Sequence, residues 1–264
     1  MKPFPIFLRA KALGTGLLLG LLLLYVLACP WWSYALVLGM AFGIAYWGTT
    51  QITSHFYLPT HCYGNSPHRK QMALTFDDGI LEPEQTQQIL AILERYNIPA
   101  TFFCIGKNIQ HPIQQKLLLH IHESGHLIGN HSFSHAHLFD FYSKSRIVEE
   151  IQQTDALIGD LIGQQPLFFR PPYGITTPNI ANALKQLPHQ TIGWSVRSLD
   201  TVIKNEKQLL GRLKKQLHPG AIILLHDHIK TLPTVLPLFL DYVLKEGYTI
   251  VGLDQLLQLP AYQH

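Results

Sequence analysis

Residues 71–79, Gln-Met-Ala-Leu-Thr-Phe-Asp-Asp-Gly, are the most informative stretch for the architecture of this 264-residue chain. The apolar run 71–76 ends in two carboxylates and a glycine that allows a sharp turn. Short apolar runs bounded by turn residues are typical of buried strands. Further strands are predicted on the same grounds at 100–105, 126–130, 166–170, 190–195, 221–226 and 248–251.

Stretches with helical spacing and length separate these strands, at 84–96, 113–124, 144–162, 206–217 and 234–246. Such alternation implies parallel strands joined by right-handed crossovers. One domain of this kind commonly reaches roughly 200–250 residues. We therefore predict an α/β fold, a distorted (β/α) barrel of seven or eight strands, in a domain at residues 68–264.

The N-terminal part of the chain is apolar in two separate segments. Residues 12–29 and 33–48 carry no charge, and Pro30-Trp31-Trp32 divides them. At about 1.5 Å per residue each helix would nearly cross a bilayer core of about 30 Å. The G-x-x-x-G patterns at 16–20 and 39–43 would let two helices pack closely. We predict a transmembrane helical hairpin as a membrane anchor at residues 1–48, followed by a polar linker at 49–67.

Other N-terminal arrangements stay open. A cleaved signal peptide, a lipoprotein signal ending at Cys29 and a single span all fit the first apolar segment. Lys2, Arg9 and Lys11 favour a cytoplasmic N-terminus, so a hairpin would return the remaining chain to the cytoplasm, whereas one crossing would place it outside. We expect an anchor in the bacterial inner (cytoplasmic) membrane and leave the face of the domain undecided.

Composition excludes some partners. The chain has 20 Lys+Arg against 17 Asp+Glu and no dense basic run, so nothing indicates nucleic-acid binding. Cys29, Cys62 and Cys104 lack the spacing of a disulfide framework or a zinc ribbon. No protein partner is predicted.

Polar residues gather at the predicted C-terminal strand ends, where barrels carry their active sites. Asp77 and Asp78 end the first strand. His131 and His135 are four residues apart, so on a helical turn both imidazoles would share one face and could hold one metal ion. With Asp78 they form a set of two histidines and one carboxylate, which suits zinc, cobalt or iron.

Two more motifs end strands. Arg170-Pro171-Pro172-Tyr173-Gly174 places an arginine, able to pair with a buried carboxylate, before a turn stiffened by prolines. Leu224-Leu225-His226-Asp227 ends an apolar strand with a histidine suited to donate a proton near neutral pH. Taken singly, each of these motifs is also compatible with a purely structural role.

Together, in the order TFDDG, HSxxH, RPPYG, a strand-end aspartate and LLHD, these motifs resemble the polysaccharide deacetylase (NodB-homology) family, also called carbohydrate esterase family four, over residues 68–255. The resemblance implies that Asp77 is the catalytic base and that Arg170 orients it. It implies a divalent metal, zinc before cobalt, held by Asp78, His131 and His135.

The resemblance also assigns the remaining site residues. Tyr173 would stabilise the oxyanion through its backbone N–H, and His226 would be the general acid held by Asp200. Trp194 and Leu224 resemble residues that wall the acetyl pocket. The chain departs from the family pattern at Ile80, where proline is common, and at Thr201, where tryptophan is common.

The expected function is metal-dependent removal of the N-acetyl group from an amino sugar in a glycan such as peptidoglycan or a chitooligosaccharide. The alternative enzymatic hypothesis is deacetylation or deformylation of a polyprenyl-linked amino sugar in the membrane. A carbohydrate-binding protein without catalysis is the alternative from another class.

Overall fold

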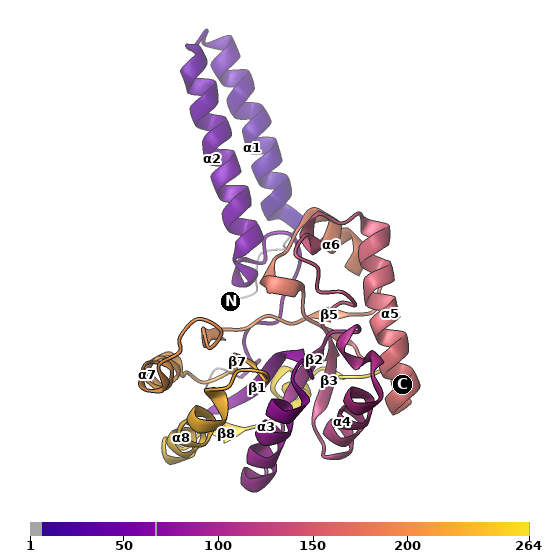
Figure 1. The fold of residues 1–264 in the computed structure, drawn as a ribbon. Coiled ribbons are helices and arrows are strands. Elements are labelled where there is room, and N and C mark those ends of the chain that lie inside the picture. The colour runs from indigo at the N-terminus through magenta and orange to yellow at the C-terminus, as the bar shows by residue number, and fades with distance from the viewer. Residues whose placement is uncertain (1–6, 67, 264) are drawn as a thin grey trace.

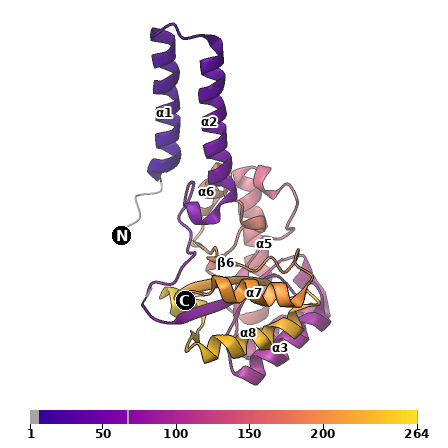
Figure 2. The ribbon, with the colours of Figure 1, turned by 90° about the vertical axis from the view of Figure 1, so that its left-hand side faces the viewer.

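A computed structural model describes the backbone of residues 7–66 and 68–263. Two long helices, α1 (Phe7–Val26) and α2 (Trp31–Thr50), stand side by side and extend from an α/β body that contains the other described helices and strands (Figure 1). Turning the molecule by a quarter shows the same separation (Figure 2).

A curled sheet of eight parallel strands forms the body. Its strands are β1 (Gln71–Gly79), β2 (Thr101–Cys104), β3 (Leu127–Asn130), β4 (Phe168–Phe169), β5 (Gln190–Thr191), β6 (Val196–Arg197), β7 (Ala221–His226) and β8 (Thr249–Ile250). They are ordered β5-β4-β3-β2-β1-β7-β6, with β8 beside β1, and β5 and β6 do not pair within the described residues. The distorted barrel is confirmed as an open one. Of the strand predicted at 190–195, only residues 190–191 form a strand, β5; β6 follows at 196–197, at the opposite edge of the sheet.

Helices cover the outside of this sheet: α3 (Pro83–Tyr96), α4 (Pro112–Glu123), α5 (Lys144–Ile162), α7 (Glu206–Gln216) and α8 (Leu232–Lys245). All five were predicted to within about two residues. Two were not, α6 (Pro178–Leu184) and α9 (Leu253–Leu257), because a helix of five to seven residues shows too little of the 3.6-residue period. Short 3-10 turns lie at Ile52–Ser54, Asn108–Gln110, Phe139–Phe141 and Pro172–Gly174.

Successive side chains of strand β1 point to opposite faces of the sheet, so alternate residues of β1 belong to two different hydrophobic clusters. Met72, Leu74 and Phe76 belong to the large cluster shared with the outer helices, in which Phe76 stacks on Phe102 at 4.9 Å between ring centroids. Ala73 belongs to the smaller cluster inside the barrel. Asp77 shares the parity of Ala73, so its carboxylate points into the barrel.

The segment predicted as a linker packs on the body instead of standing free. Ile52, Phe56, Leu58 and Cys62 are buried. Its end also bridges the open side of the barrel: His61 exchanges backbone hydrogen bonds with the chain at the end of β5, and Gly64 N donates to Gly220 O, just before β7, at 2.8 Å. Residues 52–64 therefore help to close the barrel.

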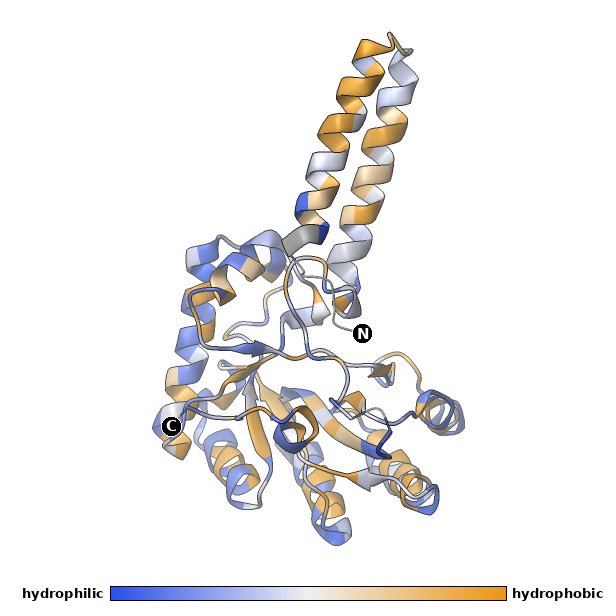
Figure 3. Cartoon of the chain, turned by 180° about the vertical axis from the view of Figure 1, so that it is seen from behind, coloured by the Kyte–Doolittle hydropathy of each residue, from blue (hydrophilic) through white to orange (hydrophobic). Residues whose placement is uncertain are grey.

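Helices α1 and α2 have 20 residues each and so are about 30 Å long, enough for a bilayer core. Within the described residues one window, Arg9–Val26 in α1, meets the length and hydropathy criteria for a membrane span. Tryptophan, tyrosine and threonine at its ends lower the hydropathy of α2. Large apolar side chains nevertheless lie exposed on both helices, and long stretches of both helices are hydrophobic (Figure 3).

The glycine patterns of these helices do not form their contact. A side-chain carbon placed on Gly20 would lie 3.8 Å from Val37 Cγ1, but Gly16, Gly39 and Gly43 have nothing within 4 Å. The prediction of G-x-x-x-G packing is wrong here, because three of its four glycines face outward.

The end of α2 is fixed to the body. Thr176 N donates to Thr49 O at 3.1 Å, and Phe56 packs so closely on Gly48 that no Cβ could stand there. The helices and the barrel therefore share a packed junction.

Removing the Phe56 ring tests this junction. Phe56→Ala should lower the free energy of unfolding by about 3–5 kcal/mol, because the ring is buried between α2 and the body. Urea denaturation of the full chain in detergent, followed by tryptophan fluorescence, measures it. Tyr63→Ala, at a half-exposed ring on the same segment, is the control and should change stability by less than about 1 kcal/mol. Equal effects of the two variants would contradict a packed segment.

Candidate active site

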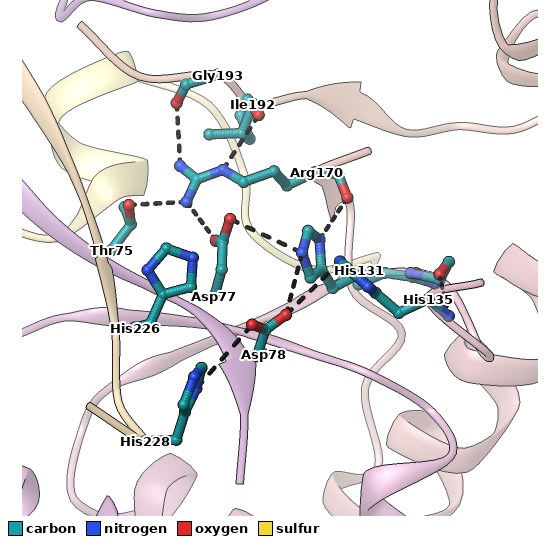
Figure 4. A network of polar contacts seen from close by, with 12 residues as sticks. Thr75, Asp77, Asp78, His131, His135, Arg170, Ile192, Gly193, His226 and His228 are labelled. Atoms are coloured by element: carbon teal, nitrogen blue, oxygen red, sulfur yellow. Dashed lines mark hydrogen bonds and ion pairs between the residues drawn. The ribbon is translucent and has the colours of Figure 1, made fainter. Parts of the chain in front are cut away.

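One cavity of about 260 Å³ at the C-terminal end of the barrel collects most of the predicted site residues. It is lined by Asp77, Asp78, His131, His135, Tyr173, Trp194, Arg197, Leu199, Thr201, Leu224 and His226. Arg170 lies beneath it and contacts Asp77 (Figure 4). Asp200 is buried behind His226.

The end of β1 presents both carboxylates to this cavity. The pairing of β1 with β2 shifts register between Phe76 and Gly79, and Asp78 has a φ of 62°. This bulge turns Asp78 out of the strict alternation that would send neighbouring side chains to opposite faces. Asp77 points toward Arg170 while Asp78 points toward the histidines (Figure 4).

Arg170 is fully buried and every nitrogen of its guanidinium has an acceptor. Nη1 donates to Asp77 Oδ1 at 2.6 Å and to Thr75 Oγ1 at 2.9 Å. Nη2 and Nε donate to the carbonyls of Gly193 at 3.0 Å and Ile192 at 3.3 Å. Burial disfavours the ionised form of Asp77, but the charges of Arg170, His131 and His226, with the hydrogen bond from Arg170, together outweigh burial and lower the pKa of that carboxyl. Asp77 is therefore an oriented carboxylate.

The two histidines come together on a loop. Residues 131–138 form no helix, and Ser132 and His135 have φ values of 65° and 47°. The predicted helical turn is wrong, yet the two imidazole centroids lie 4.8 Å apart. His131 Nδ1 lies 2.7 Å from Arg170 O, so this nitrogen carries the proton and Nε2 keeps its lone pair toward the cavity.

Asp78, His131 and His135 can hold a metal ion. Their ligand atoms all lie within 4.8 Å of one another. Asp78 Oδ1 is 3.8 Å from His131 Nε2 and 3.6 Å from His135 Nε2, and it is buried without a hydrogen-bond partner. Burial, together with the neighbouring carboxylates, raises the pKa of Asp78 to about 6. An orphaned oxygen facing two imidazole lone pairs fits a divalent cation, which would satisfy all three.

Glu150 of α5 fixes the loop that carries these histidines, a role that was not predicted from the sequence. Its carboxylate accepts from Ser134 N at 2.7 Å, from Ser134 Oγ at 2.9 Å and from Phe133 N at 3.2 Å. Left-handed non-glycine residues cost of order 1–3 kcal/mol each, so such a loop needs external support. The sequence did contain a signal for this role: Glu150 occupies an inward position of an amphipathic helix, between Ile147 and Ile151, where an unpaired glutamate is rare.

His226 and Asp200 form a second pair at the end of β7, where His226 is the register partner of Asp77 on β1. Asp200 Oδ1 lies 2.8 Å from His226 Nδ1, and Oδ2 accepts from the His226 backbone N–H at 2.8 Å. Burial lowers the pKa of His226, but the hydrogen bond and charge of Asp200, with the charges of Asp77 and Asp78, outweigh burial and raise the pKa to about 9. At neutral pH His226 is thus an imidazolium whose orientation is set from behind.

Tyr173 and Trp194 shape the mouth of the cavity. Tyr173 has a φ of 59° within the turn that follows Pro171 and Pro172. Its hydroxyl donates to His135 O at 3.3 Å. Gly174 lies against the Trp194 ring so closely that no Cβ would fit. Trp194 and Leu224 line the same cavity and give it apolar surface.

The two departures from the family motifs have local consequences. Ile80 has a φ of 65°, which a proline ring forbids, and its N–H donates to Asp227 Oδ2 at 3.0 Å. Asp227 also accepts from Thr86 Oγ1 at 2.7 Å, so this turn ties β7 to α3. Thr201 lines the cavity, and its N–H donates to Asp200 Oδ1 at 3.0 Å. Neither departure removes a polar group from the site.

His228 is another neighbour that the sequence analysis did not single out. Its Nδ1 lies 4.0 Å from Asp78 Oδ2, the oxygen turned away from the histidines (Figure 4). This histidine follows the strand-end motif by two residues, and only the turn after β7 brings it back toward Asp78.

Known proteins resemble the chain. The profile of a family described as polysaccharide deacetylase matches residues 64–192. The peptidoglycan-N-acetylmuramic acid deacetylase PdaA of Bacillus subtilis is 32% identical over 199 residues, covering 74% of each chain. The solved structure of the Bc1960 peptidoglycan N-acetylglucosamine deacetylase, 27% identical, matches with a TM-score of 0.71 over 76% of this chain and 94% of that one.

A third similar structure is that of wild-type BA3943 from Bacillus anthracis, described as a CE4 family pseudoenzyme. It is 26% identical, with a TM-score of 0.67 over 74% of this chain and 67% of that one. Active deacetylases and a pseudoenzyme thus share this fold. The fold therefore does not indicate activity, and the evidence for activity must come from the residues of the cavity.

A pair of neighbouring glutamates tests the support of the histidine loop. Glu150→Gln should weaken binding of Zn²⁺ or Co²⁺ by about 10–100-fold, because an amide cannot accept all three hydrogen bonds from the loop. Glu149→Gln is the matched control: both glutamates lie beside Arg146, but the Glu149 side chain is 53% exposed and that of Glu150 is 1%. Isothermal titration calorimetry measures both, and equal affinities would refute the role of Glu150.

Proposed function

The chain belongs to the polysaccharide deacetylase family, hydrolases of non-peptide amide bonds, and we propose that it removes the N-acetyl group from an amino sugar of a peptidoglycan-type glycan in a metal-dependent reaction. The observation that carries this proposal is the cavity in which Asp77, paired with Arg170, and His226, paired with Asp200, end the neighbouring strands β1 and β7 beside a set of metal ligands. A base and an acid side by side in one cavity suit hydrolysis of an amide.

Asp78, His131 and His135 would hold the metal, with zinc proposed before cobalt. Two histidines and one carboxylate are a ligand set that leaves coordination positions open. When bound, a divalent cation lowers the pKa of water toward neutrality and stabilises negative charge on a carbonyl oxygen. The fixed tautomer of His131 and the loop bonds of Glu150 keep the ligand atoms turned to one point.

Asp77 would act as the base. It takes a proton from water as the water oxygen attacks the acetamide carbonyl carbon, and the lowered pKa of Asp77 keeps the carboxylate ionised at neutral pH. Arg170 limits its rotation by holding Oδ1, which leaves Oδ2 toward the cavity. The resulting tetrahedral oxyanion would be stabilised by the Tyr173 backbone N–H, and one such donor is typically worth about 3–4 kcal/mol.

His226 would act as the acid. It gives its Nε2 proton to the amide nitrogen as the carbon–nitrogen bond breaks, releasing acetate and the free amine. The hydrogen bond from Nδ1 to Asp200 stabilises the imidazolium before this transfer. Trp194 and Leu224 would enclose the acetyl methyl group in the apolar part of the cavity.

The proposed division of the chain is a membrane anchor at 1–48, a connecting segment at 49–67 and a catalytic domain at 68–264. Supporting the anchor are two helices of about bilayer length with exposed apolar faces, a surface that is costly in water. We propose the bacterial inner membrane as its location.

A lipid-linked amino sugar is the second candidate substrate. One observation favours it: Thr176, three residues beyond Tyr173 of the cavity, hydrogen-bonds to Thr49 at the end of α2. The catalytic loop is thus tied directly to the proposed anchor. If both helices cross the bilayer, the domain lies on the same face as Arg9 and Lys11, which favours the cytoplasmic side.

An assay on purified full chain in detergent tests the function. We expect acetate release from peptidoglycan or N-acetylglucosamine oligomers, loss of that release with chelator and recovery with zinc or cobalt. Acetate or formate released solely from a polyprenyl-linked N-acylamino sugar would establish the second candidate. No release from any of these substrates would contradict both and favour a glycan-binding protein.

Two adjacent substitutions separate the base from the metal ligand. Asp77→Asn should retain metal but lower turnover by about 10²–10⁴-fold. Asp78→Asn should lose metal as well, because it removes the carboxylate from the ligand set. For both variants, mass spectrometry measures the metal content and an acetate-release assay measures turnover. An Asp77→Asn enzyme with full activity would refute the proposed base.

Asp200→Asn tests the acid through the pH profile. His226 must be protonated to donate, so activity should fall as pH rises through its pKa, about 9 in the native chain. Removing the Asp200 charge lowers that pKa, so the alkaline limb of kcat should move to lower pH while the acidic limb stays in place. An alkaline limb at the native pH would show that His226 is not the titrating acid.

A further inference from the structure

Two adjoining pockets lie where the proposed anchor meets the domain, away from the catalytic cavity. One, of about 190 Å³, lies between residues 57–59 and α6. The other, of about 130 Å³, lies between α6 and the N-terminal end of α1 at Ala10 and Lys11, here called the foot of α1. They share Tyr57, Ala181 and Lys185, so they form one continuous depression, here called the junction groove.

The groove combines an apolar floor with a basic rim. Leu58, Ala181 and Leu184 supply aliphatic carbon, and Tyr57 adds an aromatic ring. Lys11 and Lys185 stand at the rim, and both are exposed. Among the described lining residues none is acidic. Such a surface matches a ligand with a negative headgroup and a hydrocarbon tail.

The position of the junction groove indicates which ligand with a negative headgroup and a hydrocarbon tail could bind there. Helix α6 lies at the end of the domain that faces α1 and α2 (Figures 1 and 2), and Ala10 and Lys11 of α1 line the same pocket as Pro178 and Ala181 of α6. A hydrogen bond from Arg9 Nη1 to Ser54 O holds that foot on the connecting segment. If the two helices cross a bilayer, the foot of α1 lies at the level of the phospholipid headgroups.

We propose that the junction groove binds an anionic phospholipid, with Lys11 and Lys185 holding the phosphate and the floor at Leu58 and Leu184 receiving the first carbons of an acyl chain. This proposal rests on the membrane anchor of the proposed function but not on the catalytic assignment. A bound lipid would fill the space between α1, residues 57–59 and α6, and so would join the anchor and the domain through a third component.

Short-chain lipids added to the full chain in a non-ionic detergent test this. Native mass spectrometry should detect one dioctanoyl phosphatidylglycerol bound more tightly than dioctanoyl phosphatidylcholine, and inorganic phosphate should not compete at equal concentration. Dihexanoyl phosphatidylglycerol should bind more weakly than the dioctanoyl form, since less acyl chain reaches the floor. Equal affinity for the two headgroups, or for the two chain lengths, would overturn the proposal.

A charge-matched pair of variants locates the site. Lys11→Gln combined with Lys185→Gln should weaken phosphatidylglycerol binding roughly 10- to 30-fold, the effect expected of two lysines near a phosphate. Lys116→Gln combined with Lys245→Gln removes the same charge from α4 and α8, on the side of the domain away from the helices, and should leave binding unchanged. Equal weakening by both double variants would refute a site in the groove.

Membrane extraction separates this proposal from the one on which it rests. If alkaline carbonate releases the chain from membranes without detergent, the anchor is wrong and the lipid site falls with it. If the chain stays in the membrane while the Lys11/Lys185 variant binds lipid like the native chain, the anchor stands and the groove does not bind lipid. Acetate release should be equal in the native chain and in both double variants.

Discussion

The ion pair between Arg170 and Asp77 is the constraint on which the interior of the barrel depends. A fully buried guanidinium costs several kcal/mol to desolvate, and it is tolerated only with complete hydrogen bonding. Thr75, Asp77, Ile192 and Gly193 supply that bonding, and the Phe103 ring lies 4.1 Å below the guanidinium carbon. One side chain thereby holds the end of β1 against the chain that follows β5.

The Arg170–Asp77 pair also contacts one of the proposed metal ligands, His131. The backbone carbonyl of Arg170 accepts from His131, and the same residue's side chain holds Asp77, whose Oδ2 lies 3.7 Å from His131 Nε2. The ligand loop is held from its other side by Glu150 of α5. The base and the metal ligands are therefore parts of one network, so loss of the arginine would disturb both, beyond the loss of one contact.

Residues at the ends of regular strands could be predicted from the sequence, because an apolar run fixes where its strand ends. Asp77, Arg170 and His226 are of this kind, and the structure brings Asp77 and His226 to one cavity with Arg170 beneath it. The path of the histidine loop could not be predicted, since left-handed conformations at Ser132 and His135 depend on Glu150, a partner remote in the chain. Spacing alone favoured a helix for these residues.

The connecting segment was missed for a different reason. Alternate residues from Ile52 to Cys62 are buried, but serine and threonine occupy some of the inward positions and two residues of the stretch 49–67 are prolines, so the pattern reads as polar. Burial there is set by contacts with Gly193 and Gly220, far along the chain. Local hydropathy carries no information about such partners.

That burial limits how far the catalytic cavity can travel. A flexible tether of the same length, residues 49–66, would let a domain wander by about 20–25 Å from its anchor. Here the segment is part of the barrel wall, so the cavity keeps one height and one tilt relative to the two helices. Attached to a bilayer, such an enzyme would search a thin layer of constant depth and move between substrates by lateral diffusion, instead of reaching outward into the surrounding polymer.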